Sequence, residues 1–72
     1  MNLYNELNKI KGLRKGVKLM IECKDGEVIK GEYSGYTKAL DNEPEISQVD
    51  ILSFEGIMYG LLETEIASIK KI

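Results

Sequence analysis

The chain of 72 residues contains no histidine, no tryptophan and only one cysteine. Without histidine, the commonest general base of enzymes is missing, and Cys23 has no histidine partner to activate its thiol. A single thiol forms neither an internal disulfide nor a structural zinc site of the Cys/His kind. We therefore expect a protein that is not an enzyme and that holds no metal or cofactor.

Long hydrophobic runs are also missing. No segment reaches the roughly 18 apolar residues of a membrane-spanning helix. The N-terminal segment MNLYNELNKIKG lacks the basic start and apolar core of a signal peptide. A lone cysteine is typical of the reducing cytoplasm. We expect a cytoplasmic protein without membrane association, folded as one domain over residues 1–72.

A chain of this length has a small core, because it buries only about 60% of the surface that its unfolded form exposes. Small scaffolds often add disulfides, metals or oligomer contacts to compensate. Since the first two are not expected, a homo-oligomer is a reasonable prediction. The composition, 43% hydrophobic and 31% charged, is that of an ordinary folded protein.

The net charge of −2 hides an asymmetry along the chain. Residues 1–38 carry eight Lys/Arg against five Asp/Glu, whereas residues 39–69 carry seven acids and no Lys or Arg. Lys70 and Lys71 then follow. Such a division fits a face for an acidic partner, head-to-tail contact between copies, or an ordinary solvated surface.

The first element predicted is a short helix over about residues 3–11. Apolar side chains repeat at helical spacing at Leu3, Leu7 and Ile10. Asn2 is placed to cap the first turn, and Gly12 follows the last one.

Two strands joined by a tight turn come next. An alternation that only Met20 breaks predicts a half-buried strand with Val17, Leu19, Ile21 and Cys23 on its inner face. Asp25-Gly26 is a hairpin turn signal. The second strand, about residues 27–36, carries Gly31 and Gly35 on one face, which permits a sharp bend.

After a loop over residues 37–45, the chain predicts three further strands, over about 46–54, 57–63 and 66–72. The apolar register of the third shifts to Leu52 and Phe54, which predicts a bulge. The apolar run IMYGLL predicts burial on both faces of the fourth. Sequential antiparallel strands with glycine bends are typical of a small barrel, here over about residues 16–72.

The strand VKLMIEC, the turn Lys24-Asp25-Gly26 and the strand EVIKGEY resemble the Sm-like family and, more broadly, Src-homology-3-like barrels. EIASIKKI resembles the closing strand of that family. The chain is also similar to small bacterial barrel proteins of unassigned function. The resemblance implies a mostly β fold, with a short N-terminal α-helix and a five-stranded, strongly bent antiparallel Sm-like small β-barrel.

Two family motifs differ in this chain. Sm proteins place an aspartate and an asparagine after the glycine-bent strand, where they form a base pocket. Here Asp41 and Asn42 are adjacent and lie further from Gly31. The arginine-glycine pair between strands four and five is replaced by Glu63-Thr64-Glu65. The resemblance therefore extends to the fold more than to the RNA site.

RNA binding through the basic end of the helix is the alternative function. Lysine and arginine neutralise phosphates, and tyrosine stacks on bases. The candidate RNA contacts are Lys11, Arg14, Lys15, Tyr36, Asp41 and Asn42. The pI of about 5.1 and the acidic second half oppose phosphate binding. A solvated helix end beside core tyrosines is the competing interpretation.

The acidic segment and the cysteine have simpler explanations. Oxygen ligands for calcium or magnesium are present at Asp41, Asn42, Glu43, Glu45 and Asp50, but without the spacing of a calcium loop. A solvated loop, with Asp41 or Asn42 bonded to its own turn, is expected instead. Cys23 is expected to be a small core residue.

Protein contact is the remaining class. Small barrels expose edge strands that pair with other chains, and in Sm-like rings strands four and five of neighbouring subunits pair. Candidate self-association residues are Ile57, Tyr59 and Leu61. We therefore expect a non-catalytic interaction or scaffold module of unknown partner, self-associating through barrel edge strands.

Overall fold

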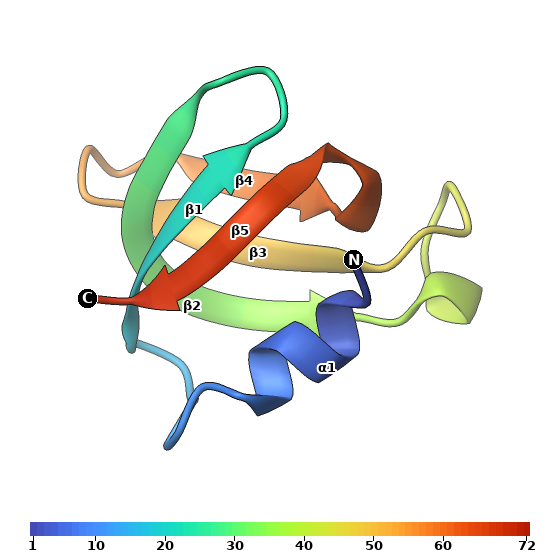
Figure 1. Cartoon of the computed structure of the whole chain (residues 1–72), viewed down its shortest axis with the longest axis horizontal. Helices are drawn as coiled ribbons and strands as arrows, with labels where there is room; N and C mark the ends of the chain where they lie inside the picture. The colour runs from blue at the N-terminus through green and yellow to red at the C-terminus, as the bar shows by residue number, and fades with distance from the viewer.

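The computed structural model describes all 72 residues as one helix and five strands, as predicted. The elements are α1 (Leu3–Asn8), β1 (Lys18–Cys23), β2 (Val28–Thr37), the 3-10 turn η1 (Ala39–Asp41), β3 (Gln48–Ser53), β4 (Met58–Leu62), the 3-10 turn η2 (Glu63–Glu65) and β5 (Ile66–Lys71). All strands belong to one antiparallel sheet in the order β4-β3-β2-β1-β5 (Figure 1). The one α-helix is far too short to cross a membrane.

The helix α1 is shorter than predicted but capped as predicted. The side-chain oxygen of Asn2 accepts a 3.0 Å hydrogen bond from the backbone N–H of Asn5. The regular helix ends at Asn8, and single turns carry the chain to Gly12, whose φ of +71° favours glycine. Within the helix, Leu3 and Leu7 are buried.

The turn between β1 and β2 uses three residues, Lys24-Asp25-Gly26. The N–H of Gly26 donates to the carbonyl of Cys23 at 3.0 Å, and the N–H of Cys23 donates to Glu27 at 2.8 Å. Only Gly26 has a positive φ, +92°. The carboxylate of Asp25 accepts the N–H of Glu27 at 2.9 Å, which holds the turn closed.

Strand β2 bends because its two halves pair with different neighbours. Its first half pairs with β1, and from Gly31 onward it pairs with β3. A Cβ atom on Gly31 would lie 2.7 Å from the Cα of Ser53, so only glycine permits this approach. The register shifts between Tyr33 and Gly35. Because this bulge adds a residue, Tyr33 and Tyr36 both pack against the core, and both are half-buried.

The predicted bulge in the third strand is wrong, because β3 keeps its alternation to the end. Ser53 is buried, whereas Leu52 and Phe54 are exposed on the outer face. The buried hydroxyl of Ser53 accepts the N–H of Ile57 at 3.0 Å. A small polar residue therefore occupies the inner position, because it closes the turn to β4.

Burial of β4 on both faces is also wrong. Leu61 is the one residue of β4 that is buried, and Met58 is 55% exposed. Ile57, just before the strand, is 51% exposed. The reason is its position, since β4 is an edge strand that has β3 on one side and no strand on the other. Part of the apolar run IMYGLL is therefore exposed to solvent.

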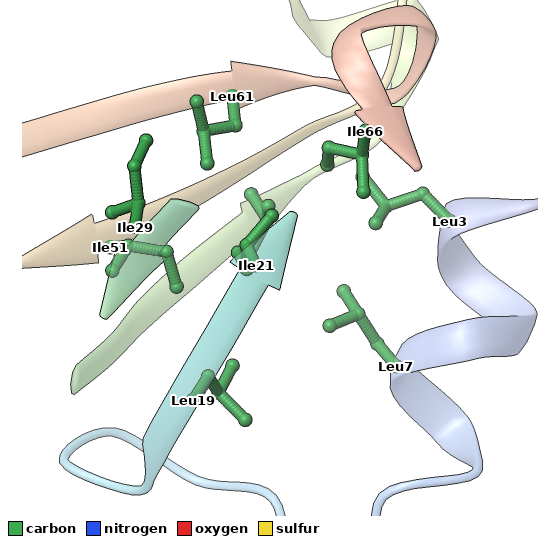
Figure 2. Packing of buried hydrophobic residues seen from close by; sticks show 9 residues of the cluster. Leu3, Leu7, Leu19, Ile21, Ile29, Ile51, Leu61 and Ile66 are labelled. Atoms are coloured by element: carbon green, nitrogen blue, oxygen red, sulfur yellow. The ribbon is translucent and has the colours of Figure 1, made fainter. Parts of the chain in front are cut away.

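The core brings α1 and all five strands together. Its buried apolar residues are Leu3, Leu7, Leu19, Ile21, Ile29, Val49, Ile51, Leu61 and Ile66. Figure 2 shows their side chains converging, with Leu3 and Leu7 entering from α1. Strands β1 and β5 cross in front of β3 and β4 in Figure 1, so the core lies between the two pairs of strands.

The sheet has two free edges. Strands β4 and β5 stand at opposite ends of the strand order, yet the three residues of η2 join them. The edges therefore approach each other at η2. No ladder of hydrogen bonds joins β4 to β5, so the structure is an open five-stranded sheet.

Candidate functional site

One side of β4 carries no partner strand. The ladder between β3 and β4 has hydrogen-bonded pairs at both ends, where Ser53 donates to the carbonyl of Ile57 at 2.8 Å and Glu63 donates to Ser47 at 2.9 Å. In an antiparallel ladder, alternate residues turn their backbone groups to alternate sides. Counting from Ile57 in steps of two, the backbone groups of Tyr59 and Leu61 therefore face β3.

The intervening residues face the open side. These residues are Met58, Gly60 and Leu62. The N–H of Leu62 is satisfied by the carboxylate of Glu65 at 2.9 Å. The backbone groups of Met58 and Gly60 remain free for another chain, as on any uncovered sheet edge.

A groove of about 440 Å³ runs along this edge. The β4 side is formed by Tyr59, Gly60 and Leu61, and the other side by the β1–β2 turn and η2. Ile29 from β2 and Cys23 from β1 complete its apolar wall. The groove thus lies where the two edges of the sheet approach without pairing.

The rim of the groove is acidic. Asp25, Glu27 and Glu65 line it, against Lys24 as the one cation. Burial raises the pKa of the Cys23 thiol above its ordinary value, and the negative charges of these three carboxylates raise that pKa further. Cys23 is only half-buried, at the groove wall, rather than enclosed in the core as expected.

The predicted self-association residues fall on this side of the molecule. Tyr59 and Leu61 lie in β4 and Ile57 directly precedes it, and by alternation the three residues share the inner face. Leu61 is buried in the core, Tyr59 is half-buried in the groove wall, and Ile57 is exposed at the β3–β4 turn. The structure therefore brings two of the three residues to the groove.

An apolar patch on the outer face was not predicted. A second hollow, of about 640 Å³, has Met20, Val28 and Phe54 in its lining, together with Ile29 and Tyr59 from the inner face. Leu52 and Met58 pair across β3 and β4 and are both exposed. The apolar residues Leu52 and Met58 would have indicated this patch in the sequence only if β4 had been recognised as an edge strand.

The basic residues of the two chain ends meet in space. The ammonium of Lys71 donates to the carbonyl of Lys11 at 3.3 Å, and the N–H of Ile72 donates to the carbonyl of Lys18 at 3.1 Å. In Figure 1 the C-terminus lies beside the start of β1. We use the name basic face for the cations of the two segments that these bonds join, Lys11, Arg14, Lys15, Lys18, Lys70 and Lys71. Lys70 and Lys71 are consecutive in β5, so their side chains point to opposite sides of the sheet. The pairing of β5 with β1 creates this face, which the sequence order alone does not reveal.

Tyr36 lies near the basic face but is only partly accessible. Its ring centroid is 6.0 Å from that of Tyr4, and both rings line a hollow of about 280 Å³ between α1 and β2. Burial raises the pKa of the neighbouring Tyr33, with Asp50 and Tyr36 as further causes. The N–H of Gly16 donates to the carbonyl of Tyr33 at 2.9 Å, so the basic segment passes close by.

The other two candidate RNA contacts lie elsewhere. Asp41 and Asn42 are in the loop after β2, far from segment 11–15 (Figure 1). The side-chain amide of Asn42 donates to the carbonyl of Ile46 at 2.9 Å and to the side chain of Gln48 at 3.1 Å. The prediction that an Asp or Asn binds its own loop is confirmed for Asn42.

Comparisons of the chain with models of protein families, with curated proteins and with solved structures gave no match. Function is therefore inferred from the free edge of β4, the groove beside it and the basic face.

Proposed function

We propose that the protein is a non-catalytic interaction module that joins other chains along the free edge of β4. The observation that carries the proposal is the row of unpaired backbone groups at Met58 and Gly60, which lies directly beside a groove with apolar walls. An extended segment added to such an edge gains backbone hydrogen bonds and a place for its side chains at once.

A second copy is the first partner to test. The N–H of Ile72 faces β1, so by alternation the backbone groups of Ile69 and Lys71 face the open side of β5. Each molecule thus offers two free edges, and the basic end of β5 complements the acidic rim of the groove beside β4. The placement of β4 and β5 at the two edges also supports the Sm-like barrel interpretation, in which these strands pair between neighbours.

Light scattering at several concentrations tests self-association. We expect the mass to rise above the 8.1 kDa of one chain as the concentration increases. Met58→Pro removes an edge N–H without removing a ladder bond, and should lower the mass toward that of the monomer. Met58→Ala keeps the N–H and is the matched control. A monomer at every concentration would remove self-association from the proposal.

RNA binding is a second candidate, and the basic face is the observation that favours it. Hydrogen bonds join the two segments that carry these six cations, and Tyr36 lines a hollow together with Leu13 of the N-terminal segment. Filter binding at low salt tests this function with the double variant Arg14→Glu/Lys15→Glu. The control Lys30→Glu/Lys38→Glu makes the same charge change elsewhere. Loss of retention only in the first variant supports the site, and no retention of RNA by the unmodified protein contradicts it.

A further inference from the structure

We infer that the groove beside β4 is a docking site for an extended peptide segment of another protein, one that alternates apolar and basic residues. The inference rests on the proposed function and names the chemistry of the partner. Three features of the groove carry it, namely free backbone groups, apolar walls and an acidic rim.

The backbone of the segment is selected by the free edge. Met58 and Gly60 present N–H and C=O groups to the groove side, where no strand pairs with them. A strand added there would lie about 4.8 Å from β4 and satisfy both residues. This requirement selects an extended segment rather than a helix, because a helix has already used its backbone groups internally.

The apolar residues of the segment are selected by the groove walls. Successive side chains of a strand point to opposite faces, so every second one enters the groove. There they meet Ile29, Tyr59 and Leu61. Burying apolar side chains against these walls is favourable at about 25 cal/mol per Å².

The basic residues are selected by the rim. The carboxylates of Asp25, Glu27 and Glu65 outnumber the one ammonium, that of Lys24. All four side chains are exposed, so they act on the charges of a ligand at the mouth of the groove. An acidic segment or a nucleic acid backbone would be repelled here, whereas lysine or arginine would be attracted.

A separate segment fits the groove more simply than the β5 edge of a second copy does. Strand β5 is tied to the N-terminal segment near both of its ends. Leu3 donates to Glu63 just before β5, and Lys71 reaches the carbonyl of Lys11 at its end. If the β5 edge of a second copy bound in the groove, the α1 helix of that copy would have to lie close to the groove as well. A separate peptide segment has no attached helix to accommodate.

Fluorescence anisotropy with a labelled short peptide of alternating valine and lysine tests the inference. We expect saturable binding to the full chain and none of a valine–glutamate peptide. Glu27→Lys should weaken binding about tenfold, which corresponds to about 1.4 kcal/mol. The control Glu32→Lys makes the same charge change on the outer face of the same sheet. Met58→Pro should weaken binding, and Met58→Ala should not.

Equal binding of both peptides, no binding of either, or equal effects of Glu27→Lys and Glu32→Lys would overturn the inference. If Met58→Pro fails to fold in a thermal melt, the Glu27 and Glu32 pair still decides. Oligomers without peptide binding would leave the proposed function standing and remove this inference. Peptide binding by a strict monomer would support this inference and remove self-association. A strict monomer that binds neither peptide would remove both.

Discussion

The backbone N–H of Leu3 donates a 2.7 Å hydrogen bond to the carboxylate of Glu63, sixty residues later in the chain. The same carboxylate oxygen accepts the hydroxyl of Ser47 at 3.2 Å. Leu3 begins α1, and a negative charge is favourable at a helix N-terminus. One side chain of η2 therefore joins the helix to the segment before β3, at the point where the two sheet edges approach.

Glu63→Ala should destabilise the fold. Leu3 is fully buried, so its N–H would lose a partner that water does not easily replace. We expect the free energy of unfolding to fall by about 1–3 kcal/mol, measured by urea titration. Glu43→Ala, in the exposed loop, is the control and should change it by less than about 0.5 kcal/mol. Equal effects of the two substitutions would contradict the role of Glu63.

The two glycines of β2 should respond differently to alanine. A Cβ on Gly31 would meet the backbone of Leu52 and Ser53, whereas a Cβ on Gly35 meets nothing within 4 Å. Gly31→Ala should lower the free energy of unfolding by about 1–3 kcal/mol or more, because backbone must move to admit the methyl group. Gly35→Ala should change it little. Thermal melts of both variants give the comparison, and a tolerated Gly31→Ala would show that β2 and β3 are further apart.

The first half of the fold was predictable because its signals are local. The alternation of β1, the cap at Asn2 and the glycine turn all depend on neighbouring residues. The bulge in β2 depends instead on pairing with β3, which lies beyond the next loop. The prediction that β4 is buried on both faces was wrong for a similar reason. The segment IMYGLL indicates a core strand unless the strand order is known to place it at an edge.

The thiol of Cys23 should report the charge of the groove. Alkylation requires the thiolate, and burial together with the acidic rim raises the pKa of this thiol. The midpoint of alkylation rate against pH should therefore lie higher in the folded than in the denatured protein. Glu27→Lys should move that midpoint down, and Glu32→Lys should leave it unchanged. No difference between the two variants would contradict an acidic rim.

The same shift predicts how stability changes with pH. The folded state holds the thiol proton of Cys23 more tightly than the unfolded chain, because its pKa is raised. This contribution is complete below the pKa of the unfolded thiol and is lost as pH rises through the folded pKa. The free energy of unfolding of the unmodified protein should therefore fall, relative to that of Cys23→Ser, as pH rises above the pKa of the unfolded thiol. Urea titration across the alkaline range measures this difference.

Alanine substitutions at Asn42 and Asp41 should have different effects on stability. The side-chain amide of Asn42 bridges Ile46 and Gln48, whereas the side chain of Asp41 makes only a 3.6 Å ion pair with Lys38 on the surface. Asn42→Ala should lower the free energy of unfolding by about 0.5–1.5 kcal/mol. Asp41→Ala should have almost no effect, because exposed ion pairs contribute little. Urea titration of both variants decides, and the reverse order would contradict the assignment.

The candidate site was predictable only in part. Strand four was recognised as a contact element, and Tyr59 and Leu61 do line the groove. The acidic rim was not predicted, because Asp25 and Glu65 are forty positions apart and meet only through the fold. Lys71 joins Lys11 for the same reason, since the pairing of β1 with β5 brings the two chain ends together.

The most direct test maps where a basic strand binds. Isotope-labelled protein should be titrated with the valine–lysine peptide while its two-dimensional amide spectrum is recorded. The predicted result is that the largest shifts occur at the edge amides of Met58 and Gly60 and around the groove at Ile29 and Glu27. Shifts confined to the basic face, or no saturable shifts at all, would contradict docking along β4.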